Sequence, residues 1–344
     1  MSDSIFIGID GGATTSKIAA VRGDGSIVSM DLQQQPTGSE GGPSGVIDGW
    51  LAGSNEFLER NGLGWDQVQG IGISVPGPYL EYGVMGASPN LPPSFDGWRI
   101  IDDMTAAVEK RIGRRLPMVM GNDGNFAGVA EAARVREKGG GSVALLAPGS
   151  GLGGAFVDAT GLPLEGSTIS GMEIGHIPAP LQVLGAKAYR CGCGRDWGCF
   201  EMYTSLAGLP YLFEEALERY PDHPLAKMDG TPKERILPLR GLAQEGDELA
   251  LELFDFQAKA MGLLIGTLSM TVDPDVFVVG GGLIDPDATT PEFRARYLGG
   301  MRETALEYLW PVQRKRLNIV EAELGELSQA IGAALVVLLQ RGAT

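Results

Sequence analysis

All 3 cysteines of the chain lie between Cys191 and Cys199, and His176, one of only 2 histidines, precedes them. An odd number of closely spaced cysteines argues against a disulfide framework and favours a metal site. Three thiolates and one imidazole satisfy the tetrahedral coordination of structural zinc and leave no position open for catalysis. The pattern predicts a structural zinc bound by His176, Cys191, Cys193 and Cys199. The alternative is three separate thiols and an unrelated histidine.

Asp123 follows residues 116–120, an apolar stretch that is expected to form a short buried strand. In open α/β sheets, ligands bind beyond the carboxyl ends of the strands, and Asp123 falls there. A carboxylate at this place can accept the proton of an attacking hydroxyl group. An ordinary Asn-Asp-Gly turn before a helix over residues 126–137 explains the same residues equally well.

Two glycine-rich turns, residues 10–17 and residues 149–154, each follow a predicted strand. Glycines let backbone N–H groups approach phosphate oxygens, hydroxyls and a lysine add donors, and an aspartate can hold Mg²⁺. Each turn alone is also typical of a plain hairpin, but their equivalent positions favour a site that holds one triphosphate. The residues expected to bind the nucleotide are Asp10, Gly11, Gly12, Thr14, Thr15, Lys17, Gly149, Ser150, Gly151 and Gly153.

Both turns belong to a repeated pattern of strand, glycine turn, strand, turn and strand, which predicts two related α/β lobes. The predicted strands of the first copy are residues 5–9, 17–21 and 26–29, and those of the second are residues 142–146, 155–157 and 162–164. The expected lobes are residues 1–122 with the C-terminal helix 326–344, and residues 123–325, which include the zinc-binding loop.

The composition restricts the classes of partner. The 344 residues suffice for two domains. A net charge of −16, from 43 acidic and 27 basic residues, disfavours nucleic acid and anionic membranes. Neither a signal peptide nor a membrane-spanning segment is evident, so we expect a cytoplasmic protein.

Two further positions have simple interpretations. Asn90, in the proline-rich stretch 88–93, could hydrogen-bond a sugar hydroxyl, whereas Trp98 is better explained as a buried anchor than as a pocket wall. His223 lies in a polar, proline-flanked stretch and is expected to be a solvated loop residue.

Taken together and in this order, these motifs resemble the ROK family of sugar kinases and sugar-responsive repressors, from Gly8 to the helix near Ala334. The resemblance implies the actin-like ATPase (ribonuclease H-like) fold, with two α/β lobes and a cleft between them. It implies phosphorylation of a hexose with ATP and Mg²⁺, with Asp123 as the catalytic base. It also implies sugar contacts from Asn122, Glu173, His176 and Glu201, and an adenosine-side turn with Gly281 and Gly282. Gly77 and Asn90 are expected to contact the sugar as well.

The chain differs from the family pattern in two loops. The family motif is Cys-x-Cys-Gly-x-x-Gly-Cys-x-Glu, whereas one additional residue lies between Gly194 and Gly198 here. The stretch from His176 to Cys191 is also longer than is usual in the family. Loops tolerate such changes in length, and both changes bear on the shape of the sugar pocket.

We expect phosphorylation of glucose to glucose 6-phosphate, by a protein that the family resemblance suggests is a homodimer. The alternatives are N-acetylglucosamine, N-acetylmannosamine, mannose or fructose as the acceptor, and a sugar-binding regulatory protein without a DNA-binding domain. A repressor is disfavoured because the first predicted strand begins at Ile5, which leaves no room for a helix-turn-helix domain. A polyphosphate donor would favour a basic groove, and the sequence shows no basic stripe.

Overall fold

The computed structural model describes residues 4–87 and 91–342, which form a mixed α/β protein of two compact units. The first unit comprises residues 1–142, 155–172 and 323–344, and the second comprises residues 143–154 and 173–322. In the described residues, no helix has the length and apolar character needed to cross a membrane. The lobe boundaries expected from the sequence stay a prediction.

The first unit is built on a five-stranded sheet with the order β3-β2-β1-β4-β7. β1 pairs antiparallel with β2 and parallel with β4, which in turn pairs parallel with β7. Every residue of β1 is buried, as is typical of a strand covered on both faces. The strands are β1 (Ile5–Gly11), β2 (Thr15–Arg22), β3 (Gln33–Pro36), β4 (Val68–Ser74) and β7 (Met118–Gly121), and a separate small hairpin has β5 (Tyr79–Glu81) and β6 (Val84–Met85).

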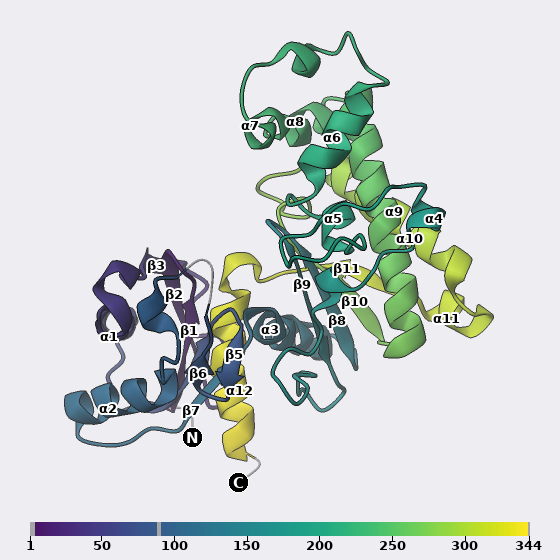
Figure 1. Cartoon of the computed structure of the whole chain (residues 1–344). Helices are drawn as coiled ribbons and strands as arrows, with labels where there is room; N and C mark the ends of the chain where they lie inside the picture. Colours follow the sequence, from purple (N-terminus) through teal and green to yellow (C-terminus); the bar gives the residue numbers. More distant parts are fainter. Residues whose placement is uncertain (1–3, 88–90, 343–344) are drawn as a thin grey trace. The chain divides into compact units, whose positions relative to one another are not determined.

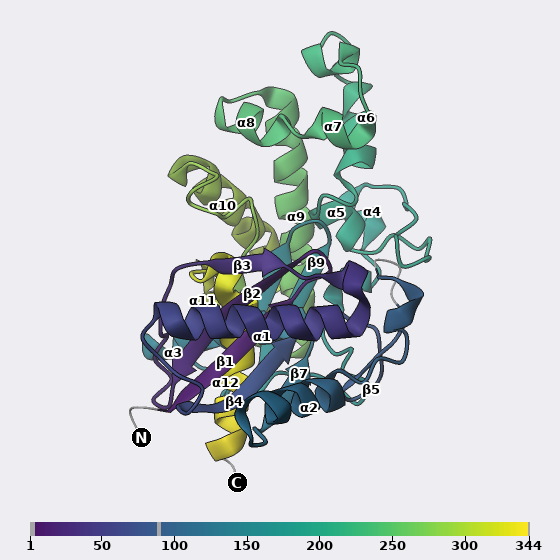
Figure 2. The same ribbon diagram turned by 90° about the vertical axis from the view of Figure 1, so that its left-hand side faces the viewer.

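Helices cover both faces of this sheet (Figures 1 and 2). On one face lie α1 (Gly42–Arg60) and α2 (Ile100–Ile112), and on the other lies α12 (Ser328–Gly342), which packs beside α3 (Asp123–Glu137). Strand glycines let α12 lie directly on the sheet: a Cβ atom on Gly8 would stand 1.8 Å from the Ala330 carbonyl oxygen, and one on Gly72 only 1.9 Å from that of Ala333. The C-terminal helix thus depends on residues that carry no side chain.

Gly72→Ala is expected to lower the free energy of unfolding of the first unit by about 1–3 kcal/mol, because the new methyl group would overpack the contact between β4 and α12. Urea denaturation followed by circular dichroism measures this change. Gly41→Ala is the matched control, since a Cβ atom there meets no atom within 4 Å. Equal denaturation midpoints for the two variants would contradict close packing at Gly72.

Two of the predicted strands are wrong. Residues 26–29 form only an isolated bridge between Ile27 and Val21, and residues 162–164 form only one between Pro163 and Val157. The third strand of the first sheet is instead β3, Gln33–Pro36, which pairs with the start of β2. Its three consecutive glutamines lack the apolar alternation that identifies a strand in a sequence.

The second unit contains a sheet with the order β11-β10-β8-β9, in which β8, β10 and β11 run parallel. Its strands are β8 (Val143–Pro148), β9 (Leu152–Val157), whose last residues belong to the first unit, β10 (Val276–Val279) and β11 (Ile319–Glu321). The two longest helices of this unit, α9 (Glu248–Thr271) and α10 (Pro291–Tyr308), pack against each other (Figure 1).

The remaining helices of the second unit are short. They are α4 (Leu181–Leu184), α5 (Glu201–Thr204), α6 (Leu209–Leu217), α7 (Pro232–Ile236), α8 (Leu239–Gln244) and α11 (Pro311–Arg316). Short 3₁₀ helices occur in both units, at Ser39–Gly41, Pro93–Phe95, Ile174–His176, Pro224–Lys227 and Gly325–Leu327.

Candidate active site

In the first unit, strand register places Asp10 and Asp123 at one edge of the sheet. Asp10 pairs with Ser74 across β1 and β4, and Ser74 pairs with Gly121 across β4 and β7. Because these three strands run parallel, their carboxyl ends meet at this edge, where ligands bind in open α/β sheets. Gly77 follows β4 at the same edge. The structure therefore brings together three of the residues expected at the site.

The carboxyl group of Asp10 has a raised pKa. Burial raises its pKa to about 6, the ammonium group of Lys17 lowers it in part, and the nearby Asp123 raises it further. Lys17 Nζ lies 3.7 Å from Asp10 Oδ2 and 3.4 Å from Glu326 Oε2. A divalent cation beside Asp10 would favour the ionised carboxylate that burial disfavours, so the position suits a ligand or outer ligand of Mg²⁺.

The glycine turn between β1 and β2 is held by residues from outside the motif. Thr37 Oγ1 donates to the Gly12 carbonyl oxygen at 2.6 Å, and the Thr37 N–H donates to that of Thr14 at 2.9 Å. Ser39 Oγ donates to the Ala13 carbonyl oxygen at 3.1 Å. These contacts fix the backbone that carries Gly11, Gly12, Thr14 and Thr15. Sequence reasoning missed Thr37 and Ser39, because no local pattern links them to the turn.

Asp123 occupies the first turn of α3. The helix begins at Asp123 and not at residue 126 as expected, because Asn122 caps it: its Oδ1 accepts a hydrogen bond from the Asn125 N–H at 3.2 Å. Asp123 Oδ1 accepts one from the Gly124 N–H at 2.9 Å. Burial raises the pKa of Asp123 above its ordinary value of 3.8. A carboxylate with a raised pKa is a stronger base, which suits proton abstraction.

Two polar residues were missed from the sequence, one in the first turn of α3 and one close to Gly121 at the end of β7. Asn125 is fully buried, and neither polar atom of its amide has a partner among the described residues. Burial raises the pKa of Glu165, and its Oε1 lies 3.0 Å from the place where a Cβ atom of Gly121 would stand. No local pattern links Glu165 to this site, because it is distant in the sequence. Asn125 follows Asp123 closely, and its polar amide was the signal that could have identified it. Asn90 lies outside the described residues.

In the second unit, the four predicted metal ligands come together. Their ligand atoms all lie within 4.8 Å of one another, with His176 Nδ1 3.6 Å from Cys191 Sγ and Cys193 Sγ 3.8 Å from Cys199 Sγ. A bridge between Pro178 and Cys199 places the end of the cysteine loop beside His176. Three thiols and one imidazole nitrogen at this spacing fit the ligand preference of zinc. That the cluster binds zinc stays a prediction.

Glu201 joins the cysteine cluster to the second glycine turn. Its Oε2 accepts a hydrogen bond from the Leu152 N–H at 3.1 Å, and its Oε1 lies 3.4 Å from Cys191 Sγ. A Cβ atom on Gly151 would stand 2.4 Å from Glu201 Oε2, so a larger residue there would displace this carboxylate. Glu173 precedes the 3₁₀ helix that carries His176, whose N–H donates to the Glu173 carbonyl oxygen at 3.1 Å.

The two glycine turns of the second unit lie side by side. β8 and β10 are parallel neighbours, so the turns after them, residues 149–154 with Ser150 and Gly153 and residues 280–282, share one edge. Gly281 has a φ of 85° and packs closely on Pro148. A Cβ atom on Gly281 would stand 1.9 Å from the Pro148 carbonyl oxygen. Gly282 accepts a hydrogen bond from Arg240 Nη1 at 3.3 Å. The arrangement offers backbone groups of both turns to one nucleotide.

The interpretations of His223 and Trp98 have different outcomes. His223 is not a solvated loop residue: its Nε2 lies 2.9 Å from Asp247 Oδ2, and its side chain is 11% exposed. Asp247 is the N-cap residue of α9, and the local sequence around His223 does not reveal this contact. Trp98 is buried against Trp50 and Phe95, as expected of an anchor.

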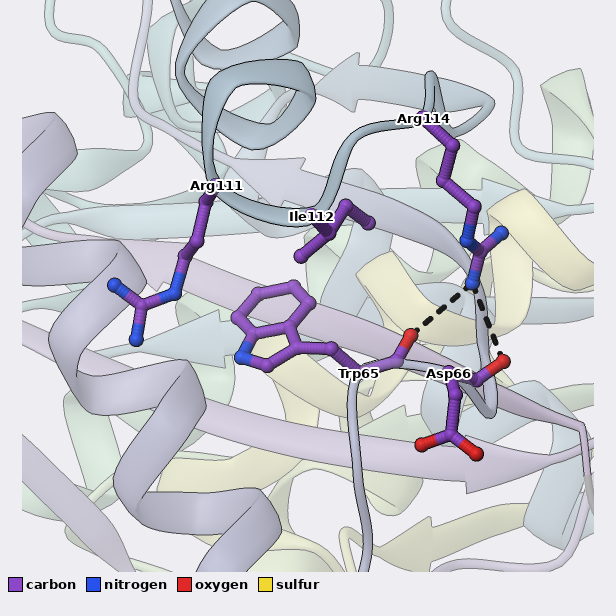
Figure 3. A pocket seen from close by; sticks show the side chains of 5 residues that line it. All are labelled: Trp65, Asp66, Arg111, Ile112 and Arg114. Atoms are coloured by element: carbon purple, nitrogen blue, oxygen red, sulfur yellow. Dashed lines mark hydrogen bonds between the residues drawn. The ribbon is translucent and has the colours of Figure 1, made fainter.

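A hollow of about 530 Å³ in the first unit lies away from the predicted site. Trp65, Asp66, Arg111, Ile112 and Arg114 line it, where α2 ends and before β4 begins (Figure 3). The guanidinium group of Arg114 donates to the carbonyl oxygens of Trp65 and Asp66, at 3.1 and 3.3 Å. Arg114 thus holds this loop in place at the opposite edge of the sheet from Asp10.

Comparisons with known proteins agree on one family. The model described as "ROK family" matches residues 6–340. A glucokinase of Halalkalibacterium halodurans is 28% identical over 82% of each chain, and an N-acetyl-D-glucosamine kinase of Salmonella paratyphi B is 28% identical over 77% of this chain and 79% of its own. The solved ROK hexokinase of Thermus thermophilus superposes with a TM-score of 0.73 at 25% identity, covering 99% of this chain and 100% of its own. The predicted actin-like ATPase fold is thereby confirmed.

Proposed function

Because this chain belongs to the ROK family, we propose that it transfers the γ-phosphoryl group of ATP to a hydroxyl group of a hexose, with glucose as the preferred acceptor. It is a sugar kinase phosphotransferase, in line with relatives that carry the names glucokinase and N-acetyl-D-glucosamine kinase. The observation that supports the proposal most is the pair Asp10 and Asp123 at the carboxyl ends of β1 and β7.

Asp123 is the proposed general base. Its carboxylate accepts the proton of the hexose hydroxyl as the oxygen bonds to the γ-phosphorus, and the bond from that phosphorus to the leaving ADP oxygen breaks in line. The burial that raises its pKa makes it a better proton acceptor at neutral pH than an exposed aspartate. The proposed Mg²⁺ position is beside Asp10, and Mg²⁺ when bound neutralises charge on the phosphates.

The nucleotide and the sugar would use the remaining predicted residues. Backbone N–H groups of the glycine turns and Lys17 would bind the phosphates, and the turn with Gly281 and Gly282 would lie on the adenosine side. Asn122 uses its Oδ1 as a helix cap, so its amide nitrogen is the group available to a sugar hydroxyl. His176 points Nδ1 at Cys191, which leaves Nε2 for the same purpose. The other proposed sugar contacts are Gly77, Asn90, Glu173 and Glu201.

A panel of hexoses tests the acceptor. We expect the coupled assay for ADP release to give a higher kcat/KM for glucose than for N-acetylglucosamine, because of the family resemblance and because the additional bulk near Trp197 would crowd the sugar pocket. An N-acetylhexosamine kinase is the second candidate, favoured by the Salmonella relative. A higher kcat/KM for N-acetylglucosamine or N-acetylmannosamine would reverse the preference. Absence of hexose-dependent ADP release across the panel would overturn the kinase proposal itself.

A further inference from the structure

The loop with the additional residue directs two N–H donors at the cysteine cluster. Trp197 Nε1 donates to Cys199 Sγ at 3.1 Å, and Arg195 Nη1 donates to Cys193 Sγ at 3.7 Å. Cys199 is fully buried, whereas Cys193 is exposed. The two donors therefore reach one sulfur on the inside and one on the outside of the cluster.

Core packing does not explain the position of Trp197. Its side chain is 47% exposed, so the ring is not part of the buried core. The guanidinium group of Arg195 lies over the ring at 5.1 Å, and the Cys191 N–H donates to the Arg195 carbonyl oxygen at 2.8 Å. The hydrogen bond to Cys199, the stacked cation and the backbone turn are thus the contacts that hold the ring over the cluster.

The chemistry of the cluster explains why donors would be useful there. Zinc with three thiolates and one neutral imidazole carries a net negative charge, and hydrogen bonds to charged acceptors are about twice as strong as neutral ones. Donors around a metal site orient the ligands, and their loss typically costs about 10–100-fold in metal affinity. We propose that Trp197 and Arg195 are positioning residues that hold the thiolates of Cys199 and Cys193 and slow the release of zinc. This inference depends on the predicted zinc and not on the identity of the sugar.

Zinc release from the purified full chain tests the proposal. With a chromogenic chelator in excess, Trp197→Phe is expected to release its zinc roughly 10-fold faster than the parent, because phenylalanine keeps an aromatic ring and removes the N–H donor. Arg195→Met, which keeps an unbranched side chain and removes the guanidinium donors, should also accelerate release. Trp310→Phe is the matched control, since Trp310 is 66% exposed in the same unit. Parent-like release by both loop variants would overturn the proposal.

A spectroscopic measurement separates a bond to sulfur from general loosening of the loop. In cobalt(II)-substituted protein, loss of an N–H donor raises the energy of the sulfur lone pairs, so the thiolate-to-cobalt absorption of Trp197→Phe should move to longer wavelength. The same band should be unmoved in Trp310→Phe. An unchanged band in Trp197→Phe would overturn the role of the indole N–H, and a parent protein without bound metal would overturn the whole inference. Hexose phosphorylation is measured separately, so failure of the kinase proposal would leave these results interpretable.

Discussion

Asp123→Asn is expected to lower turnover with glucose by roughly 10²–10⁴-fold, the range that general-base catalysis contributes. The asparagine keeps the shape of the side chain and an acceptor for the Gly124 N–H, but it cannot take up a proton. Sugar binding should change far less than turnover, because the hydrogen bonds to the sugar can remain. Initial rates and the dissociation constant for glucose, measured on the same preparation, separate the two effects.

The folded state should tolerate this substitution. Burial raises the pKa of Asp123, so the ionised carboxylate is less favourable in the folded than in the unfolded protein above that pKa. A neutral asparagine removes this cost at neutral pH, and the temperature of unfolding should not fall. Asp48→Asn, at an exposed position of α1, is the matched control. If Asp123→Asn is folded and turns over at close to the parental rate, Asp123 is only a turn residue, and Glu173 becomes the next candidate base.

Part of the candidate site could be predicted from the sequence. The prediction was possible where the position of a residue after a strand, or its residue type alone, identifies it. Asp10 and Asp123 were expected near strand ends, and parallel pairing through β4 brings those ends together. The cysteine cluster needed only the rarity of cysteine and histidine in the chain. In both cases the prediction rests on local sequence or on composition, and it does not require knowledge of which other segments pack nearby.

Features that depend on tertiary contacts could not be predicted. β3 is a polar strand whose place is set by pairing with β2, and Thr37 beyond its end braces the first glycine turn. The partner of His223 is Asp247, which a long segment of chain separates from it. Both cases require knowledge of which segments meet. The early start of helix α3 is different, because the Asn122 cap is a local signal that sequence reasoning overlooked.

Cys199→Ala is expected to abolish stoichiometric zinc binding, the second large effect. Cys199 is fully buried beside the other predicted ligands, and a site with three ligands loses the closed coordination of structural zinc. Elemental analysis of chelator-washed protein should find about one equivalent of zinc in the parent and almost none in the variant. Because structural zinc contributes directly to folding free energy, the second unit should also unfold several degrees lower.

The consequences should extend to the nucleotide. Glu201 lies 3.4 Å from Cys191 Sγ and binds the Leu152 N–H of the second glycine turn, so loosening of the cluster frees that turn. We therefore expect the KM for ATP to rise in Cys199→Ala. Zinc stripped from the parent by prolonged exposure to excess chelator, beyond the brief wash used for elemental analysis, and then restored should recover the original KM, whereas added zinc should not rescue the variant. A parent protein that contains no zinc and has fast-reacting thiols, or a variant that keeps a full equivalent, would show that the cluster is not a structural zinc site.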